Sequence, residues 1–553
     1  MLSNIDLAVL IVYLGGMVAF GFWFARKSSS TEEFMAAGRS LPGWAVGLSI
    51  FGTFVSSISF LANPGKSFGG NWNPFVFGLS LPLAAFIAAK WFVPFYRKSG
   101  EVSAYSHLEH RFGVWARLYV VCCFLVLQIV RIGVIMMLAA TPIRLMTGWD
   151  MSTIIIVIGI LVTLYTLLGG IEAVIWTDVV QSVVLTGGAI LCIILIMIDM
   201  PEGPGQIFDI AMNAEVDGKT VNKFSLGSFS PSLMVAAPTF WITLIYGLFI
   251  NLNNFGIDQS FVQRYITAKT DKDATQSVWL GAWLFLPTSA MLFFIGTALY
   301  AYTQADTGFL EEAAHNVRAF DENVDADTAH EDVLKNDEVF PAFIAYRLPV
   351  GVKGILIAAI FAAAMSSIDS SLNSSATLIL ADFYKRFKNP NASERASMTV
   401  LYSTTLILGF IGTLLGLGLM GQDSMLDIWW KLSGILSGGM LGLFLLGIIS
   451  KRAGNPAAIL GVILGMIVIA WMTISSIIES LDKAIADPSS PSPFEFMRGI
   501  IEPIRIVETN MNGLMTIVFG TLTIVLSGML FGLFFKKPQP IEPKNSIEAS
   551  SEK

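Results

Sequence analysis

The residues best suited to bind an ion form a polar run inside an otherwise apolar segment. Residues 361–373 read FAAAMSSIDSSLN, between the apolar stretches ILIAAI and SSATLILADFY. A hydrocarbon interior supplies no water to these hydroxyls and this carboxylate, so we expect them to face a cavity, a partner helix or an ion. One face of the expected helix carries, at i, i+3, i+4, i+7 and i+11 spacing, Ser366, Asp369, Ser370, Asn373 and Thr377.

Two interpretations of this polar face are open. The face is rich in oxygen and poor in nitrogen and sulfur, so it suits a hard cation such as Na⁺ better than a transition metal. Serines also allow helices to pack closely and can bond to the carbonyls of their own helix. Because an intramembrane aspartate is costly without a charged or coordinating partner, Asp369 favours the ion-binding interpretation.

A second chemically distinctive residue is Arg131, in the middle of FLVLQIVRIGVIMMLAA. A mid-membrane arginine costs about 2.5–3.5 kcal/mol on insertion scales, so it should face a partner or a cavity. Its planar guanidinium can hold a carboxylate through two parallel hydrogen bonds, and Gln128 lies one turn earlier on the same face. We favour recognition of an anionic substrate; an ion pair between helices or a clamp on backbone carbonyls is the alternative.

Asp178, in GGIEAVIWTDVVQS, is expected near the start of a helix that follows a Gly-Gly turn. An acid in the first turn complements the helix dipole, and Thr177 would serve as a cap. The sequence leaves open whether Asp178 stabilises a helix end or belongs to a site. No nucleophile elbow, HExxH motif or phosphate-binding glycine loop occurs, so no residue is assigned a catalytic role and the protein is not expected to be an enzyme.

The composition places these residues in an all-helical integral membrane protein. The 553 residues are 54% hydrophobic and only 14% charged, whereas soluble domains contain about 25% charged residues. The net charge of −7 and the lack of a basic arm argue against nucleic-acid binding. Thirteen stretches have spanning length, at about 7–24, 44–62, 74–95, 117–145, 152–168, 177–199, 240–262, 277–302, 350–383, 398–420, 427–449, 456–479 and 512–535.

Charge patterns orient these spans. Alternating the loops places basic clusters on one side and the acidic loop 304–340, with eleven Asp or Glu, on the other. The positive-inside rule makes the basic side cytoplasmic, so the N-terminus is expected outside and the C-terminus inside. The basic clusters are Arg26/Lys27/Arg39, Arg97/Lys98/Arg111, Arg264/Lys269/Lys272, Lys385/Arg386/Lys388, Lys451/Arg452 and Lys536/Lys537.

Two spans are interrupted by polar residues and glycines. Residues 44–70 contain Gly47, Gly52 and a serine patch, and residues 241–265 contain a cluster of Asn, Asp and Gln around Gly256. Interrupted spans in two halves of a chain are typical of inverted-repeat transporters with a site at the membrane midplane. The sequence shows no obvious self-similarity between the halves.

The chain resembles the sodium/solute symporter family, which includes sodium/glucose, sodium/proline and bacterial sodium/sialic acid transporters. The resemblance covers about two thirds of the chain and rests on RSLPGWAVGLSIFGTFVSSISF (39–60), GGIEAVIWTDVVQ (169–181), DQSFVQRY (258–265) and LPVGVKGILIAAIFAAAMSSIDSSLNS (348–374). It implies a five-plus-five inverted-repeat core with broken helices, shared with the bacterial leucine transporter. The implied units are an extra helix (1–30), two repeats (40–200 and 238–450), two C-terminal helices (455–535) and a disordered cytoplasmic tail (536–553).

The resemblance also implies cation ligands. The family's main sodium site matches the carbonyls of Gly52, Val55 and Ala363 and the hydroxyls of Ser366 and Ser367. A second sodium site of the sialic acid branch matches Asp178, Ser366, Asp369 and Ser370. At Asp369 this chain departs from that branch, where the position resembles a serine; an added carboxylate would strengthen the second site or change its ion or proton preference.

For the substrate, the sialic acid branch implies that Ser56, Ser57, Ser59 and Arg131 form the pocket, with Gln128 beside the arginine. The glutamine that this branch carries on the next helix is absent near Gly78 and Leu79, and Phe54 and Phe77 make the pocket more apolar. For a neutral sugar or polyol, the residues expected to contact hydroxyls are Asn254, Asp258 and Gln259.

We therefore expect a Na⁺-coupled symporter of the bacterial inner membrane that imports a small carboxylate, such as sialic acid, by alternating access. Its expected partners are the substrate, Na⁺ and the lipid bilayer, with no obligate protein partner. Alternatives are a Na⁺-coupled carrier of a neutral sugar or polyol, a membrane nutrient sensor with a transporter-like domain, and a channel. Broken helices favour alternating access over a continuous pore.

Overall fold

The computed structural model describes residues 3–25, 30–167, 170–216, 218–318, 336–421, 424–486 and 509–535. Within these ranges the chain is almost entirely helical, as expected; the two strands, β1 (Ala214–Val216) and β2 (Lys219–Val221), form one antiparallel hairpin in register Ala214↔Val221. The predicted tail 536–553 lies outside the described residues.

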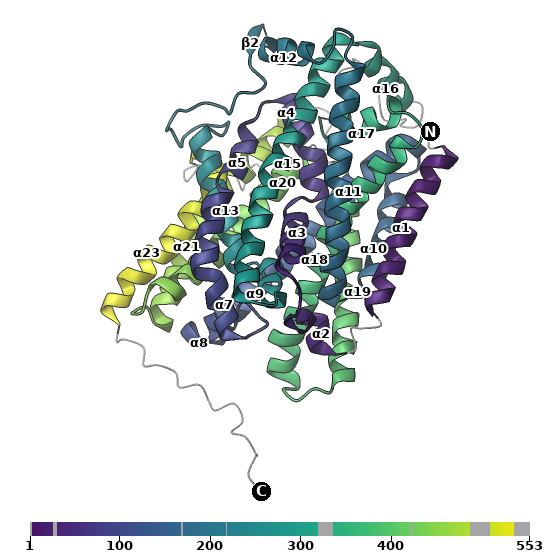
Figure 1. Ribbon diagram of the computed structural model, residues 1–553. Coiled ribbons are helices and arrows are strands. Elements are labelled where there is room, and N and C mark those ends of the chain that lie inside the picture. Colours follow the sequence, from purple (N-terminus) through teal and green to yellow (C-terminus); the bar gives the residue numbers. More distant parts are fainter. Residues whose placement is uncertain are drawn as a thin grey trace.

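Long apolar helices make up most of the molecule (Figure 1). Among the described residues, eleven helical stretches are long and apolar enough to cross a membrane, or up to twelve when a bent pair is counted as one span. The predicted count of thirteen is not confirmed, because α10 (Met151–Thr166), the helix that matches 152–168, is shorter than these stretches. Ten of the eleven are formed by α1 (Asn4–Ala25), α9 (Val114–Thr147), α11 (Gly170–Asp199), α13 (Phe240–Ile257), α15 (Asp271–Ala305), α18 (Val352–Leu378), α19 (Glu394–Gly418), α20 (Met425–Ile449), α21 (Asn455–Ala486) and α23 (Thr516–Phe534).

Shorter helices complete the spans and the loops. The stretch Asn73–Ser99 is one span built from η3 (Asn73–Phe75), α5 (Val76–Leu79), α6 (Leu81–Ile87), η4 (Ala88–Phe92) and α7 (Val93–Ser99), and η6 (Ile379–Lys388) continues α18. The remaining elements are α2 (Thr31–Ala36), η1 (Ala37–Arg39), α8 (Ser106–Phe112), α12 (Gly205–Met212), α16 (Gly308–Arg318), α17 (Asn336–Tyr346) and η9 (Gly513–Met515).

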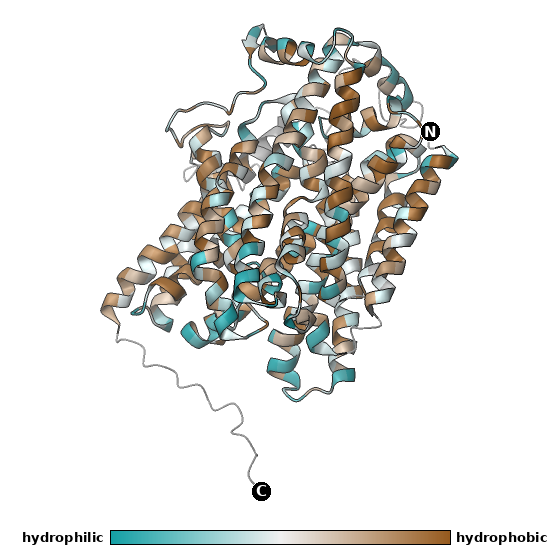
Figure 2. Ribbon diagram, in the orientation of Figure 1, coloured by the Kyte–Doolittle hydropathy of each residue, from teal (hydrophilic) through white to brown (hydrophobic). Residues whose placement is uncertain are grey.

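The helices differ sharply in burial. In α18 and its continuation, 94% of the most apolar window is buried inside the protein, whereas for α1 the share is 17%. Hydrophobic residues dominate the long helices, as Figure 2 shows, so the outer helices present apolar side chains where lipid would lie. α18 packs against α1, α3 (Gly43–Phe54), α9, α11 and α19, which makes the helix with the serine run the centre of the bundle.

Two spans are broken where the sequence predicts interruption. α3 ends at Phe54, and the chain continues at a 55° bend into η2 (Ile58–Ala62) and α4 (Asn63–Gly69). Val55 has φ −93° and ψ 86°, which is outside the helical region. In the second break, α13 ends at Ile257 and Asp258 is extended, after which α14 (Gln259–Thr267) begins. Each break leaves backbone carbonyls without helical partners.

The first and last described helices start and finish at opposite ends of the bundle. α1 begins at the end that carries α12 and α16, whereas α23 ends at the other end, which carries α8 (Figure 1). The boundaries of the two repeats, 40–200 and 238–450, run from α3 to α11 and from α13 to α20. Their relation by an inverted axis stays a prediction.

Candidate functional site

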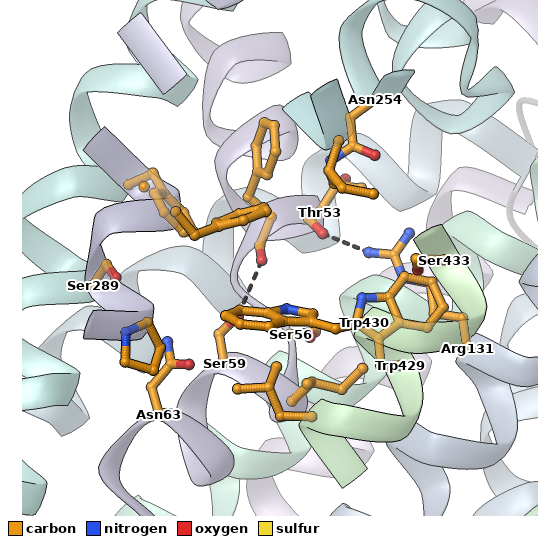
Figure 3. Close-up of a pocket in the computed structure, with 18 of the residues that line it drawn as sticks. Thr53, Ser56, Ser59, Asn63, Arg131, Asn254, Ser289, Trp429, Trp430 and Ser433 are labelled. Atoms are coloured by element: carbon orange, nitrogen blue, oxygen red, sulfur yellow. Dashed lines mark hydrogen bonds between the residues drawn. The ribbon is translucent and has the colours of Figure 1, made fainter. Parts of the chain in front are cut away.

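A cavity of about 100 Å³ lies between the two broken spans and α20. Figure 3 shows side chains from several elements converging on it. Its polar lining includes Ser56, Ser59, Asn63, Arg131, Asn254 and Asp258. Five of these six were predicted as substrate residues, so the folding of the chain brings together residues that lie up to about 200 positions apart.

Arg131 is almost completely buried, with 8% of its surface exposed. Its Nη2 donates a hydrogen bond to the Thr53 carbonyl at 2.6 Å, where α3 ends (Figure 3). The guanidinium carbon lies 6.0 Å from the centre of the Trp429 ring. The carbonyl clamp that the sequence left as an alternative is therefore present, and the same guanidinium also lines the cavity.

Three predicted substrate residues do not line the cavity. Ser57 donates to the Ile135 carbonyl at 3.3 Å, and Gln128 reaches the cavity only through a 3.4 Å hydrogen bond to the Asp258 carboxylate. The Gln259 amide bridges the backbone of Val102 and Ala104, each at 2.8 Å, on the loop before α8. These side chains form hydrogen bonds within the protein instead of facing the cavity, and sequence spacing does not reveal such partners.

Aromatic rings form most of the apolar wall. Sequence reasoning found Phe54 and Phe77 but missed the rings contributed by α13, α14, α15 and α20. The consecutive tryptophans at the start of the predicted span 427–449 were an available signal, since paired indoles at the mouth of a polar cavity suit a ring-shaped ligand. The rings that were missed are Tyr246, Phe261, Phe285, Phe293, Trp429 and Trp430.

Three of the five predicted main sodium ligands lie in contact with one another. The Ser366 hydroxyl donates to the Gly52 carbonyl at 2.9 Å and lies 3.5 Å from the Ala363 carbonyl. Ser367 is fully buried, and its Oγ has no hydrogen-bond partner within the described part of the chain. Val55 stands at the break itself. Ser367 follows directly after the serine that contacts these two carbonyls, and its unpartnered buried hydroxyl fits a ligand of a dehydrated Na⁺.

The predicted second sodium site contains a residue that sequence reasoning misplaced. Arg264, assigned above to a cytoplasmic basic cluster, is fully buried. Its Nη2 pairs with Asp178 Oδ2 at 2.9 Å and donates to Ser370 Oγ at 2.7 Å. The loop assignment is wrong because α14 carries Arg264 back into the bundle, where a carboxylate compensates its charge. No local pattern in DQSFVQRY distinguishes this arginine from a solvated one.

Asp178 does not stabilise a helix end, which was one of its two predicted roles. α11 begins at Gly170, so Asp178 lies two turns inside the helix and Thr177 is not a cap; its hydroxyl donates to the Ala173 and Val174 carbonyls at 2.9 and 3.0 Å. Asp178 also accepts a hydrogen bond from Ser49 of α3. The carboxylate therefore joins α3, α11 and α14 rather than stabilising a helix end.

Asp369 forms no ion pair with any described residue. It is fully buried, its Oδ1 lies 3.5 Å from Ser370 Oγ, and its Oδ2 has no hydrogen-bond partner among the described residues. Asp178 Oδ1 is likewise unpartnered there. Among the described residues, the buried ionisable groups of this region are three carboxyls and two guanidinium groups, so one negative charge is left over when all five are ionised; they belong to Asp178, Asp258, Asp369, Arg131 and Arg264.

The chain is similar to known membrane transporters over most of its length. The profile described as "Sodium:solute symporter family" matches residues 34–465. A sodium/sialic acid symporter of Proteus mirabilis is 33% identical over 84% of this chain and 88% of its own length, and one of Aliivibrio fischeri is 31% identical over 100% and 97%. A solved Na⁺-coupled sialic acid symporter, in a substrate-bound outward-open state, matches with a TM-score of 0.79 and 29% identity over 98% of this chain and 100% of that one.

Proposed function

This chain belongs to the sodium:solute symporter family and is a Na⁺-coupled membrane transporter, and we propose that it imports sialic acid or a closely similar carboxylate. The observation that carries the proposal is the buried Arg131 guanidinium in a cavity lined by hydroxyls and aromatic rings. A guanidinium holds a carboxylate through paired hydrogen bonds, and indole faces pack against a sugar ring. The sialic acid symporters among the relatives support this substrate class.

Two consecutive backbone carbonyls, those of Gly52 and Thr53, connect the proposed ion site with the proposed substrate site. The Gly52 carbonyl accepts the Ser366 hydroxyl of α18, and the next carbonyl, that of Thr53, accepts Arg131 of α9. A Na⁺ held by the Gly52 carbonyl and the Ser366 hydroxyl fixes the position of the end of α3, and with it the position of the Thr53 carbonyl. Arg131 is then oriented toward the cavity, so Na⁺ raises substrate affinity and the substrate raises Na⁺ affinity by the same factor.

We assign the main sodium site to the carbonyls of Gly52, Val55 and Ala363 and the hydroxyls of Ser366 and Ser367. When bound there, Na⁺ neutralises the partial charges of carbonyls released by the helix break. The unpartnered Ser367 hydroxyl supports this assignment.

We assign a second cation to Asp369, with the unpartnered oxygen of Asp178 and the Ser370 hydroxyl nearby. Arg264 already neutralises one carboxylate of this cluster, so it is the added Asp369 that leaves one charge for a mobile cation. A buried carboxylate without a partner is costly, and a bound Na⁺ removes that cost.

We place the protein in the bacterial inner membrane with its N-terminus outside and its C-terminus in the cytoplasm, on the loop charges. The opposite positions of the start of α1 and the end of α23 support this orientation (Figure 1). A neutral sugar or polyol is the second candidate substrate, because Asn254 and Asp258 also line the cavity and accept or donate hydrogen bonds to hydroxyls.

The test is uptake of radiolabelled sialic acid into proteoliposomes under an inward Na⁺ gradient. We expect concentrative uptake that Arg131→Ala abolishes, while Na⁺-dependent thermal stabilisation of the purified variant persists. Arg395→Ala, which removes an exposed arginine on α19, is the matched control and should transport normally. Full uptake by Arg131→Ala would overturn the carboxylate assignment, and competition by neutral sugars alone would establish the second candidate.

A further inference from the structure

Three charged side chains from distant parts of the sequence meet at one end of the substrate cavity. Lys66 on α4 pairs with Asp427 on α20, with Nζ 2.6 Å from Oδ2. Asp337, in the first turn of α17, faces both of them and the Met425 amide. The pair keeps partial access to water, with 28% of the Lys66 side chain and 49% of the Asp427 side chain exposed.

Lys66 and Asp427 lie close in the chain to residues that line the cavity. Lys66 lies one turn beyond Asn63, and Asp427 lies between Leu426 and Trp429; Asn63, Leu426 and Trp429 all line the cavity. α4 and α17 lie toward the end of the bundle at which α1 begins (Figure 1). The cluster is therefore on the side that the loop charges identify as external.

α17 packs directly against glycines of α4, which have no side chain to separate the two helices. A methyl group at Gly65 would lie 2.6 Å from the Asp337 carboxylate, and one at Gly69 would lie 2.3 Å from the Asn336 amide. The glycines of α4 thus permit a contact that a larger residue would prevent. A movement of α4 away from α20 would separate Lys66 from Asp427.

We propose that Lys66, Asp337 and Asp427 form the external gate of the substrate cavity, which closes when α4 packs against α17 and α20. The inference rests on the proposed alternating-access transport, in which a substrate from outside enters the cavity from the side that carries this cluster. The gate adds a charge-controlled step to that transport.

The gate responds to pH through Asp337. Burial, together with the negative charges of Asp427 and Glu338, raises the pKa of the Asp337 carboxyl to about 7, against the lowering effects of Lys66 and the Met425 amide. Opening admits water and returns the carboxyl toward its ordinary pKa of 3.8. The closed gate therefore binds the proton more tightly, so acid favours closure and a rise in pH through 7 favours opening. With these two values, the ratio of open to closed gate rises about tenfold between pH 6 and pH 8.

The experiment measures access to the cavity in intact cells. Ser433, which lines the cavity from α20, is changed to Cys in a background whose three native cysteines are replaced by serine and whose Na⁺-dependent uptake is retained. The rate of modification by a membrane-impermeant thiol reagent is then followed from pH 6 to pH 8. The same measurement with Asp337→Asn added supplies the intrinsic pH dependence of the thiol reaction.

We expect the modification rate with Asp337 intact, divided by the rate with Asp337→Asn, to rise about tenfold across this range. Lys66→Met should speed modification at every pH, because Asp427 then loses its partner. Lys219→Met, on the exposed hairpin, is the matched control and should change nothing. A ratio that does not vary with pH, together with an unchanged rate in Lys66→Met, would overturn the proposal. Because the assay uses no substrate, failure of sialic acid uptake would leave its outcome intact.

Discussion

Replacing Asp369 by asparagine tests the charge balance on which the second cation site depends. The change keeps the size of the side chain and one oxygen ligand but removes the unbalanced negative charge. Asp369 is fully buried with one oxygen unpartnered, and the only cation paired with its neighbour Asp178 among the described residues is Arg264. In the absence of Na⁺ the variant should therefore be more stable than the natural protein, since a buried carboxylate without a partner is costly.

The magnitude follows from the distance between charges. A carboxylate and a monovalent cation about 4 Å apart attract by about 4 kcal/mol at an effective dielectric constant of 20. Desolvation offsets part of this attraction, so we expect the variant to bind the second Na⁺ about 100- to 1,000-fold more weakly. At a Na⁺ concentration 100 times the original dissociation constant, stabilisation by that ion should fall from about 2.7 kcal/mol to about 0.4 kcal/mol or less.

Thermal unfolding of purified protein across a Na⁺ titration measures both effects. We expect the Asp369→Asn midpoint to be higher without Na⁺ and to rise less as Na⁺ is added, so that the two curves cross. Asp271→Asn, which removes an exposed carboxylate that pairs with Arg97 at 2.7 Å, is the control for loss of an acidic side chain. If Asp369→Asn shows the same Na⁺ dependence as the natural protein and no gain in Na⁺-free stability, the charge argument is refuted.

Further predictions concern the main sodium site, the arginine and the broken helix. Ser367→Ala should lower the apparent Na⁺ affinity, measured from Na⁺-dependent uptake, at least tenfold. Ser371→Ala removes a hydroxyl that donates to a carbonyl of its own helix at 2.8 Å and should change this affinity little. Equal affinities in the two variants would remove Ser367 from the site. Arg131→Lys should retain part of the charge but lose most uptake, because an ammonium group cannot bond a carboxylate and the Thr53 carbonyl in the same planar geometry; normal KM in this variant would argue against paired recognition. Gly296→Ala should lower the free energy of unfolding by about 1–3 kcal/mol, because its methyl group would lie 1.9 Å from the Pro64 carbonyl, whereas Gly187→Ala has open space and should be neutral or stabilising.

Sequence patterns predicted the spans because each must cross the same apolar thickness. Every predicted stretch overlaps a described helix. The two predicted interruptions correspond to the bend at residues 55–57 and the break at Asp258. These breaks were predictable because glycines and clustered polar residues interrupt the hydrophobic pattern, and a non-helical backbone at membrane depth is tolerated only where it is buried in protein or lines a cavity. The exact number of spans was not predictable, since α10 is short and its ends depend on packing.

The site was predicted in part. Ser366, Gly52 and Ala363 meet as expected, and Arg131 reaches the cavity. Gln259 instead bonds to backbone groups. An amide that contacts a substrate and an amide that joins two loops have the same sequence signature, because both require only burial and a polar partner. Which partner is present depends on a segment about 155 residues away.

The pattern of residue types identifies a helical membrane transporter with an oxygen-rich cation face, because spans need long apolar runs and polar residues inside such runs are costly and therefore conspicuous. The packing of the helices sets how the charges are shared. It moved Arg264 from a predicted loop to the buried carboxylates, and it placed Lys66 against Asp337 and Asp427 near the cavity. Charge compensation acts through distance in space, and residues that lie hundreds of positions apart come within 3 Å only when the helices pack.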